Sequence, residues 1–167
     1  PNFDTAGSGK ALLNLCNRLD KKIFIPYISC SHSRGSLFKK VISSEIPFYI
    51  NNNQVKMKPR LEGVLKCYQL SKFFKELNMD LIHSFHYGPD YSEALAAKIA
   101  GIPWVHTKKN MNWGGNSKNG WKIRSLLSSH IIMQNRDMQS LFFNNSKKTS
   151  LVPRGVDTKK YFPKKKK

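Results

Sequence analysis

The stretch of sequence that decides the fold is residues 80–107, which read DLIHSFHYGPDYSEALAAKIAGIPWVHT. Residues 80–84 form a short apolar run that predicts a strand, and residues 90–100 form an Ala-rich segment that predicts a helix. Gly101 stands where a glycine commonly ends a helix, and residues 102–107 predict the next strand. A strand, a helix and a strand in this order predict two parallel strands joined by a right-handed crossover.

The same alternation continues on both sides of this unit. Helices are predicted at residues 11–19, 36–44, 60–77, 120–128 and 136–143, and strands at residues 23–29, 46–50, 130–133 and 149–152. The strands are continuous apolar runs, as burial on both faces of a sheet requires. We therefore predict an α/β fold with a Rossmann-like, doubly wound parallel sheet. A first strand is expected before Pro1 and is missing, because the chain opens in what reads as a strand-to-helix loop.

The chain is strongly basic. Its 167 residues suit one domain, and its formal net charge is +19, with 23 Lys and six Arg spread along the sequence. Three interpretations of this charge stand open: a compositional bias toward Lys and Asn, attraction to an anionic membrane or a phosphate-bearing substrate, and nucleic-acid binding. The scarcity of Arg, which nucleic-acid recognition favours, weighs against the third.

Cysteine content and hydropathy indicate in which cellular compartment the protein is expected. Cys16, Cys30 and Cys67 are too few and too scattered for a disulfide framework or a zinc site, so free buried thiols in a reducing compartment are expected. No apolar run approaches the roughly 20 residues of a membrane span. The chain has no initial Met and no signal stretch, which predicts a fragment or a processed product. We expect a cytoplasmic protein.

A loop of small residues precedes the first predicted helix and consists of Gly7, Ser8, Gly9 and Lys10. Where side chains are small, the backbone N–H groups at a helix N-terminus can approach a phosphate closely. The pattern of a P-loop is not met, because Asp4 stands in place of its first Gly and Ala11 in place of its Ser or Thr. The loop therefore predicts either contact with a phosphate or sugar, or a tight turn that packs the helix on the sheet.

Two further loops follow predicted strands at the edge where parallel α/β sheets bind ligands. The candidate ligand-contacting residues in and beside these loops are His86, Tyr87, His106, Lys109 and Asn110. Lys offers positive charge and Asn offers amide hydrogen bonds, which suits an anionic or sugar ligand. The same residues also fit ordinary solvated turns, with His83 satisfied in the core. No Ser-His-Asp arrangement and no metal-ligand cluster stands out in the sequence.

Four segments, in this order, carry a resemblance to a known family. They are residues 7–15 (GSGKALLNL), 80–84 (DLIHS), 96–103 (AAKIAGIP) and 152–163 (VPRGVDTKKYFP). Their order and spacing across nearly all of the chain resemble the N-terminal domain of retaining glycosyltransferases of the GT-B fold, in family 4 of that class. The chain has Lys109 where this family often has a histidine, six residues after Pro103, and we expect Lys109 to keep a polar contact there.

The resemblance implies transfer of a sugar from a nucleotide-sugar donor to a glycan or lipid-linked acceptor, with retention at the anomeric carbon. The glycine loop would face the donor phosphates and sugar, and the loops after His83 and His106 would line the acceptor side. Residues 1–163 would form the N-terminal domain, with residues 151–163 leading toward an absent C-terminal donor domain and residues 164–167 as a Lys tail. The catalytic residues would lie mainly in the absent domain, so the chain alone should not catalyse transfer.

The resemblance further implies a reaction without a metal or other cofactor, in a bacterial cell-surface polysaccharide pathway. The expected partners are the nucleotide-sugar, a sugar or lipid-linked acceptor and an anionic membrane touched peripherally on its cytoplasmic face. Nucleic acid is not an expected partner. The residues themselves leave two alternatives open, a basic α/β module that binds nucleic acid or nucleotide without transfer, and a Rossmann-like domain with a purely structural role.

Overall fold

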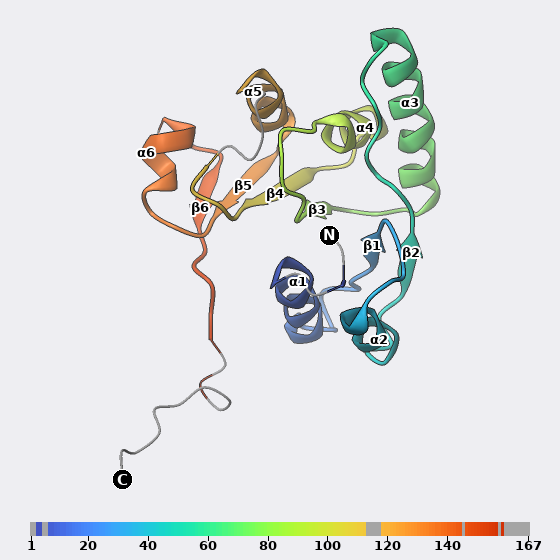
Figure 1. Cartoon of the computed structure of the whole chain (residues 1–167), viewed down its shortest axis with the longest axis vertical. Coiled ribbons are helices and arrows are strands. Elements are labelled where there is room, and N and C mark those ends of the chain that lie inside the picture. The colour runs from blue at the N-terminus through green and yellow to red at the C-terminus, as the bar shows by residue number, and fades with distance from the viewer. Residues whose placement is uncertain (1–2, 5–6, 113–117, 145, 157, 159–167) are drawn as a thin grey trace.

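Helices and strands alternate along the chain in the computed structural model, which describes residues 3–4, 7–112, 118–144, 146–156 and 158. The first described element is α1 (Gly7–Arg18) and the last is β6 (Thr149–Leu151). All strand pairings among the described residues are parallel. The predicted α/β fold with parallel strands is thus confirmed, and the strands form two sheets (Figure 1).

The larger sheet has four strands in chain order: β3 (Ile82–Ser84), β4 (Trp104–Lys108), β5 (His130–Met133) and β6 (Thr149–Leu151). In its register Ser84 pairs with His106, His106 with Ile131, and Ile131 with Thr149. Because all four strands are parallel, their carboxyl ends meet at one edge. That edge is where the candidate ligand loops were expected.

The smaller sheet consists of β1 (Ile28–Cys30) and β2 (Phe48–Ile50), which are connected along the chain by α2 (Ser36–Ile42). Strand β1 pairs with β2, and β3 pairs with β4, but β1 and β3 do not pair with each other. A cavity of about 620 Å³ is lined by residues of both β1 and β3.

The strand predicted at residues 23–29 is wrong over its first five residues, because β1 begins only at Ile28. The backbone N–H groups of Ile23 and Phe24 both donate to the carbonyl oxygen of Asp20, which closes a turn after α1. Pro26 has no N–H with which to pair in a sheet. This apolar run is therefore a loop.

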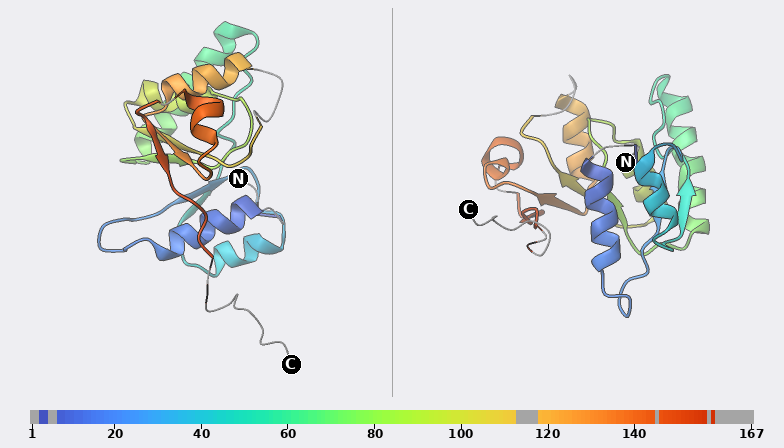
Figure 2. Two further views of the ribbon diagram at one scale, coloured as in Figure 1. Left: turned by 90° about the vertical axis from the view of Figure 1, so that its left-hand side faces the viewer. Right: turned by 60° about the horizontal axis from the view of Figure 1, so that its bottom comes forward.

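The remaining helices are α3 (Arg60–Glu76), α4 (Ser92–Ala100), α5 (Lys118–Leu127) and α6 (Met138–Phe143). Helix α4 ends as predicted at Gly101, which has a φ of 78° and donates its N–H to the carbonyl of Lys98. Helices α4 and α5 lie on one side of the four-stranded sheet, and α1 lies on the other (Figures 1 and 2). Helices thus cover both faces, as the doubly wound prediction requires.

The core has two main parts. One joins α1, β1 and α2 and includes Leu12, Ile28 and Val41, and the other joins α3, α4 and β4 and includes Phe74 and Trp104. The three cysteines are free and buried, as the sequence predicted, and burial raises the pKa of each thiol. No helix in the described part of the chain is both long and apolar enough to span a bilayer.

Candidate functional site

The loops that follow β3 and β4 leave adjacent strands at the carboxyl edge of the four-stranded sheet. Ser84, the last residue of β3, pairs with His106, so residues 85–90 and residues 109–112 emerge side by side. Two loops predicted from the sequence as ligand-contacting are therefore neighbours in space. The contacts between them decide which of the candidate side chains face a ligand and which support the loops.

Lys109 joins the two loops. Its Nζ donates a hydrogen bond to the carbonyl oxygen of Phe85 and lies 3.7 Å from the centroid of the Tyr87 ring. Burial lowers the pKa of Lys109 from 10.5 to about 7, and the positive charges of Arg154 and Arg124 act in the same direction. Near neutral pH the amine is therefore present in both its protonated and its neutral form, as a donor and as an acceptor.

His86 lies next to this pair and lines the cavity together with Tyr87. Burial lowers the pKa of His86 to about 4, and the positive charges of Arg124 and Lys109 act in the same direction. Its imidazole is therefore neutral at physiological pH and can donate one hydrogen bond and accept another. The structure thus brings together three of the predicted acceptor-side residues, His86, Tyr87 and Lys109.

The loop that carries His86 is held from below by Arg124 of α5, a residue that the sequence analysis did not single out. The Arg124 guanidinium is buried and donates to the carbonyl oxygens of His86 (3.3 Å), Gly88 (3.3 Å) and Asp90 (2.9 Å). Burial lowers the pKa of Arg124 to about 10 although two carboxylates oppose this shift, so the side chain stays charged. The sequence signal that could have pointed to Arg124 is its spacing, because it stands three residues after Trp121 and so shares one face of the predicted helix with it.

His106 does not lie on the loop surface, which corrects its predicted place on the acceptor side. Its side chain is 0% exposed and sits between Trp104 and Trp121, with ring centroids 5.2 and 6.2 Å away. Burial lowers the pKa of His106 well below its ordinary value. Strand β4 continues to Lys108, so His106 is a strand residue whose side chain points into the helix layer.

His83 lies within β3, as expected, but it is half-buried and also lines the cavity that His86 and Tyr87 line. Its Nε2 is 2.8 Å from the hydroxyl oxygen of Thr107 on the neighbouring strand. Burial lowers the pKa of His83 to about 4, so the ring is neutral and satisfied by this partner. His83 therefore supports the sheet beneath the site.

Lys108 and Asn110 form an internal brace rather than a ligand surface. The buried Lys108 ammonium donates to the backbone oxygens of Asn110 and Asn112 and, at 3.0 Å, to Asn110 Oδ1. It also lies 4.2 Å from the ring centroid of Phe142. All three of its N–H bonds are used in this way, and burial lowers its pKa to about 8. Asn110 was predicted on the acceptor side, but its oxygens point inward to this lysine.

The glycine loop belongs to α1 itself. The predicted loop residues Gly7, Ser8, Gly9 and Lys10 form the first turn of the helix, where four N–H groups lack partners within the helix. Ser8 lines the same cavity as His86 and Tyr87. A Cβ added to Gly7 would meet no atom within 4 Å among the described residues. Residues 5 and 6, which precede the turn, lie outside the described residues.

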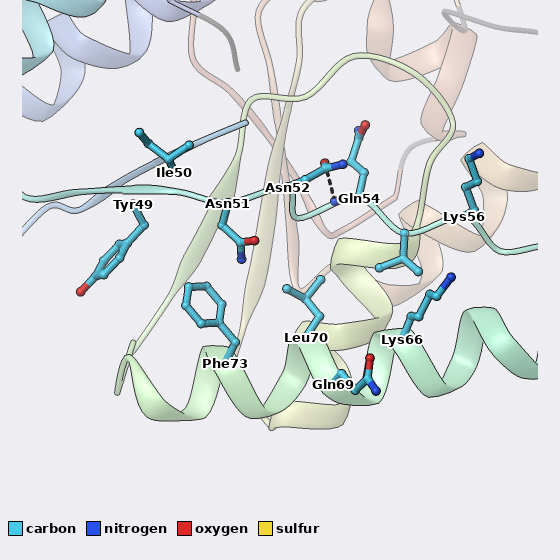
Figure 3. A pocket seen from close by; sticks show the side chains of 11 residues that line it. Tyr49, Ile50, Asn51, Asn52, Gln54, Lys56, Lys66, Gln69, Leu70 and Phe73 are labelled. Atoms are coloured by element: carbon cyan, nitrogen blue, oxygen red, sulfur yellow. Dashed lines mark hydrogen bonds between the residues drawn. The ribbon is translucent and has the colours of Figure 1, made fainter. Parts of the chain in front are cut away.

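A second depression lies between α3 and the segment that follows β2 (Figure 3). Its volume is about 720 Å³, and Tyr49 and Asn51 point in Figure 3 toward Phe73 and Leu70 of α3. Asn52 Oδ1 accepts a hydrogen bond from the backbone of Gln54 at 3.2 Å. The depression contains none of the candidate site residues and has the character of a surface furrow lined by amides.

The fold and the edge described above define an α/β domain whose ligands are contacted by loops at the carboxyl ends of parallel strands. The sequence pattern of Glycosyltransferase Family 4 matches residues 5–160 of the chain. The chain therefore belongs to this family. None of the curated proteins matches it.

Solved structures agree with this assignment at the level of the fold. A glycosyltransferase from Rickettsia africae ESF-5 is similar with a TM-score of 0.70 at 18% identity, over 93% of this chain and 41% of its own. Anabaena Alr3699/HepE in complex with UDP and glucose is similar with a TM-score of 0.66 at 15% identity, over 95% and 44%. This chain thus spans less than half the length of these structures, and it has the fold of an N-terminal GT-B glycosyltransferase domain.

Proposed function

We propose that the full protein transfers a sugar from a nucleotide-sugar donor to a glycan or lipid-linked acceptor, with retention at the anomeric carbon. The observation that carries this proposal is the family match over residues 5–160. The grouping of His86, Tyr87 and Lys109 at the carboxyl edge supports it, since sugar ligands need such convergent polar and aromatic groups. Residues 1–163 would be the acceptor-side half, and the donor half with most catalytic residues would follow them.

In this proposal the first turn of α1 faces the donor. Its unpaired N–H groups and the positive end of the helix dipole suit the diphosphate of a nucleotide-sugar. The small side chains of Gly7, Ser8 and Gly9 would let the phosphate oxygens approach, with Lys10 exposed beside them. The Anabaena protein has been solved with UDP-glucose, which makes uridine-diphosphate sugars the first donors to screen.

The acceptor would lie against His86, Tyr87 and Lys109, with Asn110 fixing the loop behind them. Tyr87 offers a ring for sugar stacking, and the neutral His86 offers one donor and one acceptor. The Lys109 amine can accept from an acceptor hydroxyl when neutral and hold a negatively charged group when protonated. The full protein would also touch an anionic membrane peripherally, on its cytoplasmic face.

The test is an assay of the full-length protein with a panel of uridine-diphosphate sugars, with release of UDP and the anomeric configuration of the product followed by NMR. We expect one donor to be consumed with retention, and the same rate in excess EDTA because no metal is proposed. Absence of UDP binding and of turnover with every donor would contradict the proposal. A product of inverted configuration would refute retention alone.

A further inference from the structure

The loop between α1 and β1 exposes large apolar side chains at a projecting point of the molecule. Ile23 and Ile25 are 71% and 77% exposed, and Phe24 is 47% exposed. Figure 2 shows the loop, in blue after α1, extending beyond the packed elements in both views. Three consecutive apolar side chains at such a point lose contact with water only if something outside the described chain covers them.

Three consecutive backbone N–H groups at the start of this loop have partners. The N–H groups of Ile23 and Phe24 donate to the Asp20 carbonyl, and the N–H of Lys22 donates to Asp20 Oδ1 at 2.9 Å. Pro26 has no N–H to satisfy. Unpaired backbone groups are what makes the entry of an irregular segment into an apolar phase costly. These three bonds lower the cost of moving the apolar tip out of water.

The base of the loop is basic. Lys21 and Lys22 directly precede the apolar tip and are exposed, and Lys21 Nζ is held at 3.2 Å from the Cys16 carbonyl at the end of α1. Between residues 7 and 50 the basic residues are Lys10, Arg18, Lys21, Lys22, Arg34, Lys39 and Lys40. Against them stand Asp20 and Glu45 alone. An apolar tip above a basic base matches a bilayer whose headgroups are anionic and whose interior is apolar.

The loop is anchored to the domain at its other end. Tyr27 stacks on Tyr49 of β2, with ring centroids 6.0 Å apart and planes inclined by 22°. Residues 28–30 then enter the sheet as β1. Insertion of the tip would therefore hold the whole domain at the surface rather than a flexible tail.

We propose that residues 21–25 are the membrane-docking element of this protein, with Ile23, Phe24 and Ile25 inserted among the acyl chains of an anionic bilayer and Lys21 and Lys22 at the headgroups. This inference names the surface for the membrane contact in the proposed function. Its test measures binding to vesicles and needs no turnover. A failure of docking and a failure of transfer are thus separate results.

The first test is co-sedimentation of the full-length protein with vesicles of phosphatidylglycerol and phosphatidylcholine. We expect Ile23→Gln with Ile25→Gln to weaken binding about tenfold or more, since two exposed apolar side chains would no longer insert. The matched control is Leu61→Gln with Leu65→Gln, because these side chains are 83% and 63% exposed on α3. Equal binding by the loop variant, or loss only in the α3 variant, would overturn the proposal.

The electrostatic part has its own pair of variants. Lys21→Gln with Lys22→Gln should weaken binding to anionic vesicles about thirtyfold, at about 1 kcal/mol per lysine near the surface. Lys118→Gln with Lys122→Gln on α5 removes the same charge at two exposed positions away from the loop and should have a smaller effect. Binding that is as strong to phosphatidylcholine alone, or equal losses in both variants, would contradict the role given to Lys21 and Lys22.

Insertion itself is read from an environment-sensitive fluorophore on Ile25→Cys, with the same fluorophore on Leu61→Cys as the control. Cys16, Cys30 and Cys67 are buried and should not react in the folded protein. The label at position 25 should shift to shorter wavelength when anionic vesicles are added, and the label at position 61 should not. A label at position 25 that is already shielded without vesicles would show that protein covers the loop, and would overturn the proposal.

Discussion

At the scale of single residues, Lys109 shows how burial turns a common side chain into one that titrates near neutral pH. The folded chain releases its proton at a pKa of about 7, whereas the unfolded chain holds it up to about 10.5. Between these values the unfolded state binds more protons, so the contribution of Lys109 to the free energy of unfolding rises with pH. Below the folded pKa the lysine is charged in both states and its burial is fully unfavourable.

Lys109→Met removes this pH dependence. We expect the stability of the wild-type protein to gain on that of the variant as the pH rises from about 7 to about 10. Urea unfolding across this range measures the difference, and Lys98→Met, at an exposed lysine of α4, is the control without such a trend. Parallel stability curves for the wild-type protein and the Lys109 variant would contradict the lowered pKa.

Gly7 separates a role in ligand binding from a role in packing. A Cβ at this position meets no atom within 4 Å, so Gly7→Val should change the free energy of unfolding by no more than about 0.5 kcal/mol. If a diphosphate lies at this helix end, the same change should weaken UDP binding about tenfold, which corresponds to about 1.4 kcal/mol. Calorimetric titration of the full-length protein with UDP measures it.

Asn14→Val on the exposed side of the same helix is the control for Gly7→Val, because it changes helix propensity but lies away from the first turn. It should leave UDP binding unchanged. Equal UDP affinities for Gly7→Val and the wild-type protein would show that Gly7 serves only the turn at the start of α1 and does not contact the ligand.

At the scale of elements, the packing of α3 against residues 56–57 requires a glycine at position 63. A Cβ on Gly63 would stand 2.7 Å from Met57 Cα, which is a backbone atom that cannot swing aside. Gly63→Ala should therefore destabilise the protein by about 1–3 kcal/mol, although alanine favours helices. Urea unfolding measures this loss, and Gln69→Ala, exposed on the same helix, should stay within about 0.5 kcal/mol.

Arg124 links α5 to the loop after β3. Arg124→Met leaves the carbonyls of His86, Gly88 and Asp90 without this donor, and we expect a loss of about 2–4 kcal/mol. Amide exchange at residues 86–90 should rise more than exchange within α4. Arg124→Lys keeps the charge but not the fork of donors, so it should recover only part of the stability. Unchanged exchange in this loop would show that its order does not depend on Arg124.

Comparison of sequence and structure shows what local patterns can predict. Helix α4 and strand β4 were predicted to within about two residues, because the apolar periodicity and the terminal Gly101 act locally. The strand predicted at residues 23–29 failed because an apolar run does not reveal whether it is buried. Here the Asp20 turn and Pro26 exclude its first part from the sheet.

The sequence could predict only those site residues that follow the end of a predicted strand. Lys109 directly follows β4 and Tyr87 stands three residues after β3, and the parallel topology brings them together. The inward direction of His106 depends on which face of the sheet is covered by α5, and the apolar run of the predicted strand does not reveal that. Arg124 was missed because its partners lie 34 to 38 residues away in the chain, beyond any local pattern.

At the scale of the whole molecule, the charge of +19 is distributed rather than concentrated. In the described residues Lys and Arg occur on every helix except α6, and one of the few arginines, Arg124, is buried and engaged with backbone carbonyls. Sequence-specific recognition of nucleic acid needs several side chains, often Arg, that reach base edges from one element. A distributed Lys surface supplies only the salt-dependent attraction to phosphate.

We therefore expect the full-length protein to bind duplex DNA and single-stranded RNA weakly, without sequence preference, and to lose this binding by about 200 mM salt. Fluorescence anisotropy with unrelated oligonucleotides at several salt concentrations measures it. Addition of UDP should not compete, because the site at the first turn of α1 involves the donor alone. Tight binding to one sequence that persists at this salt concentration would make nucleic acid a true partner and return the charge to a functional role of its own.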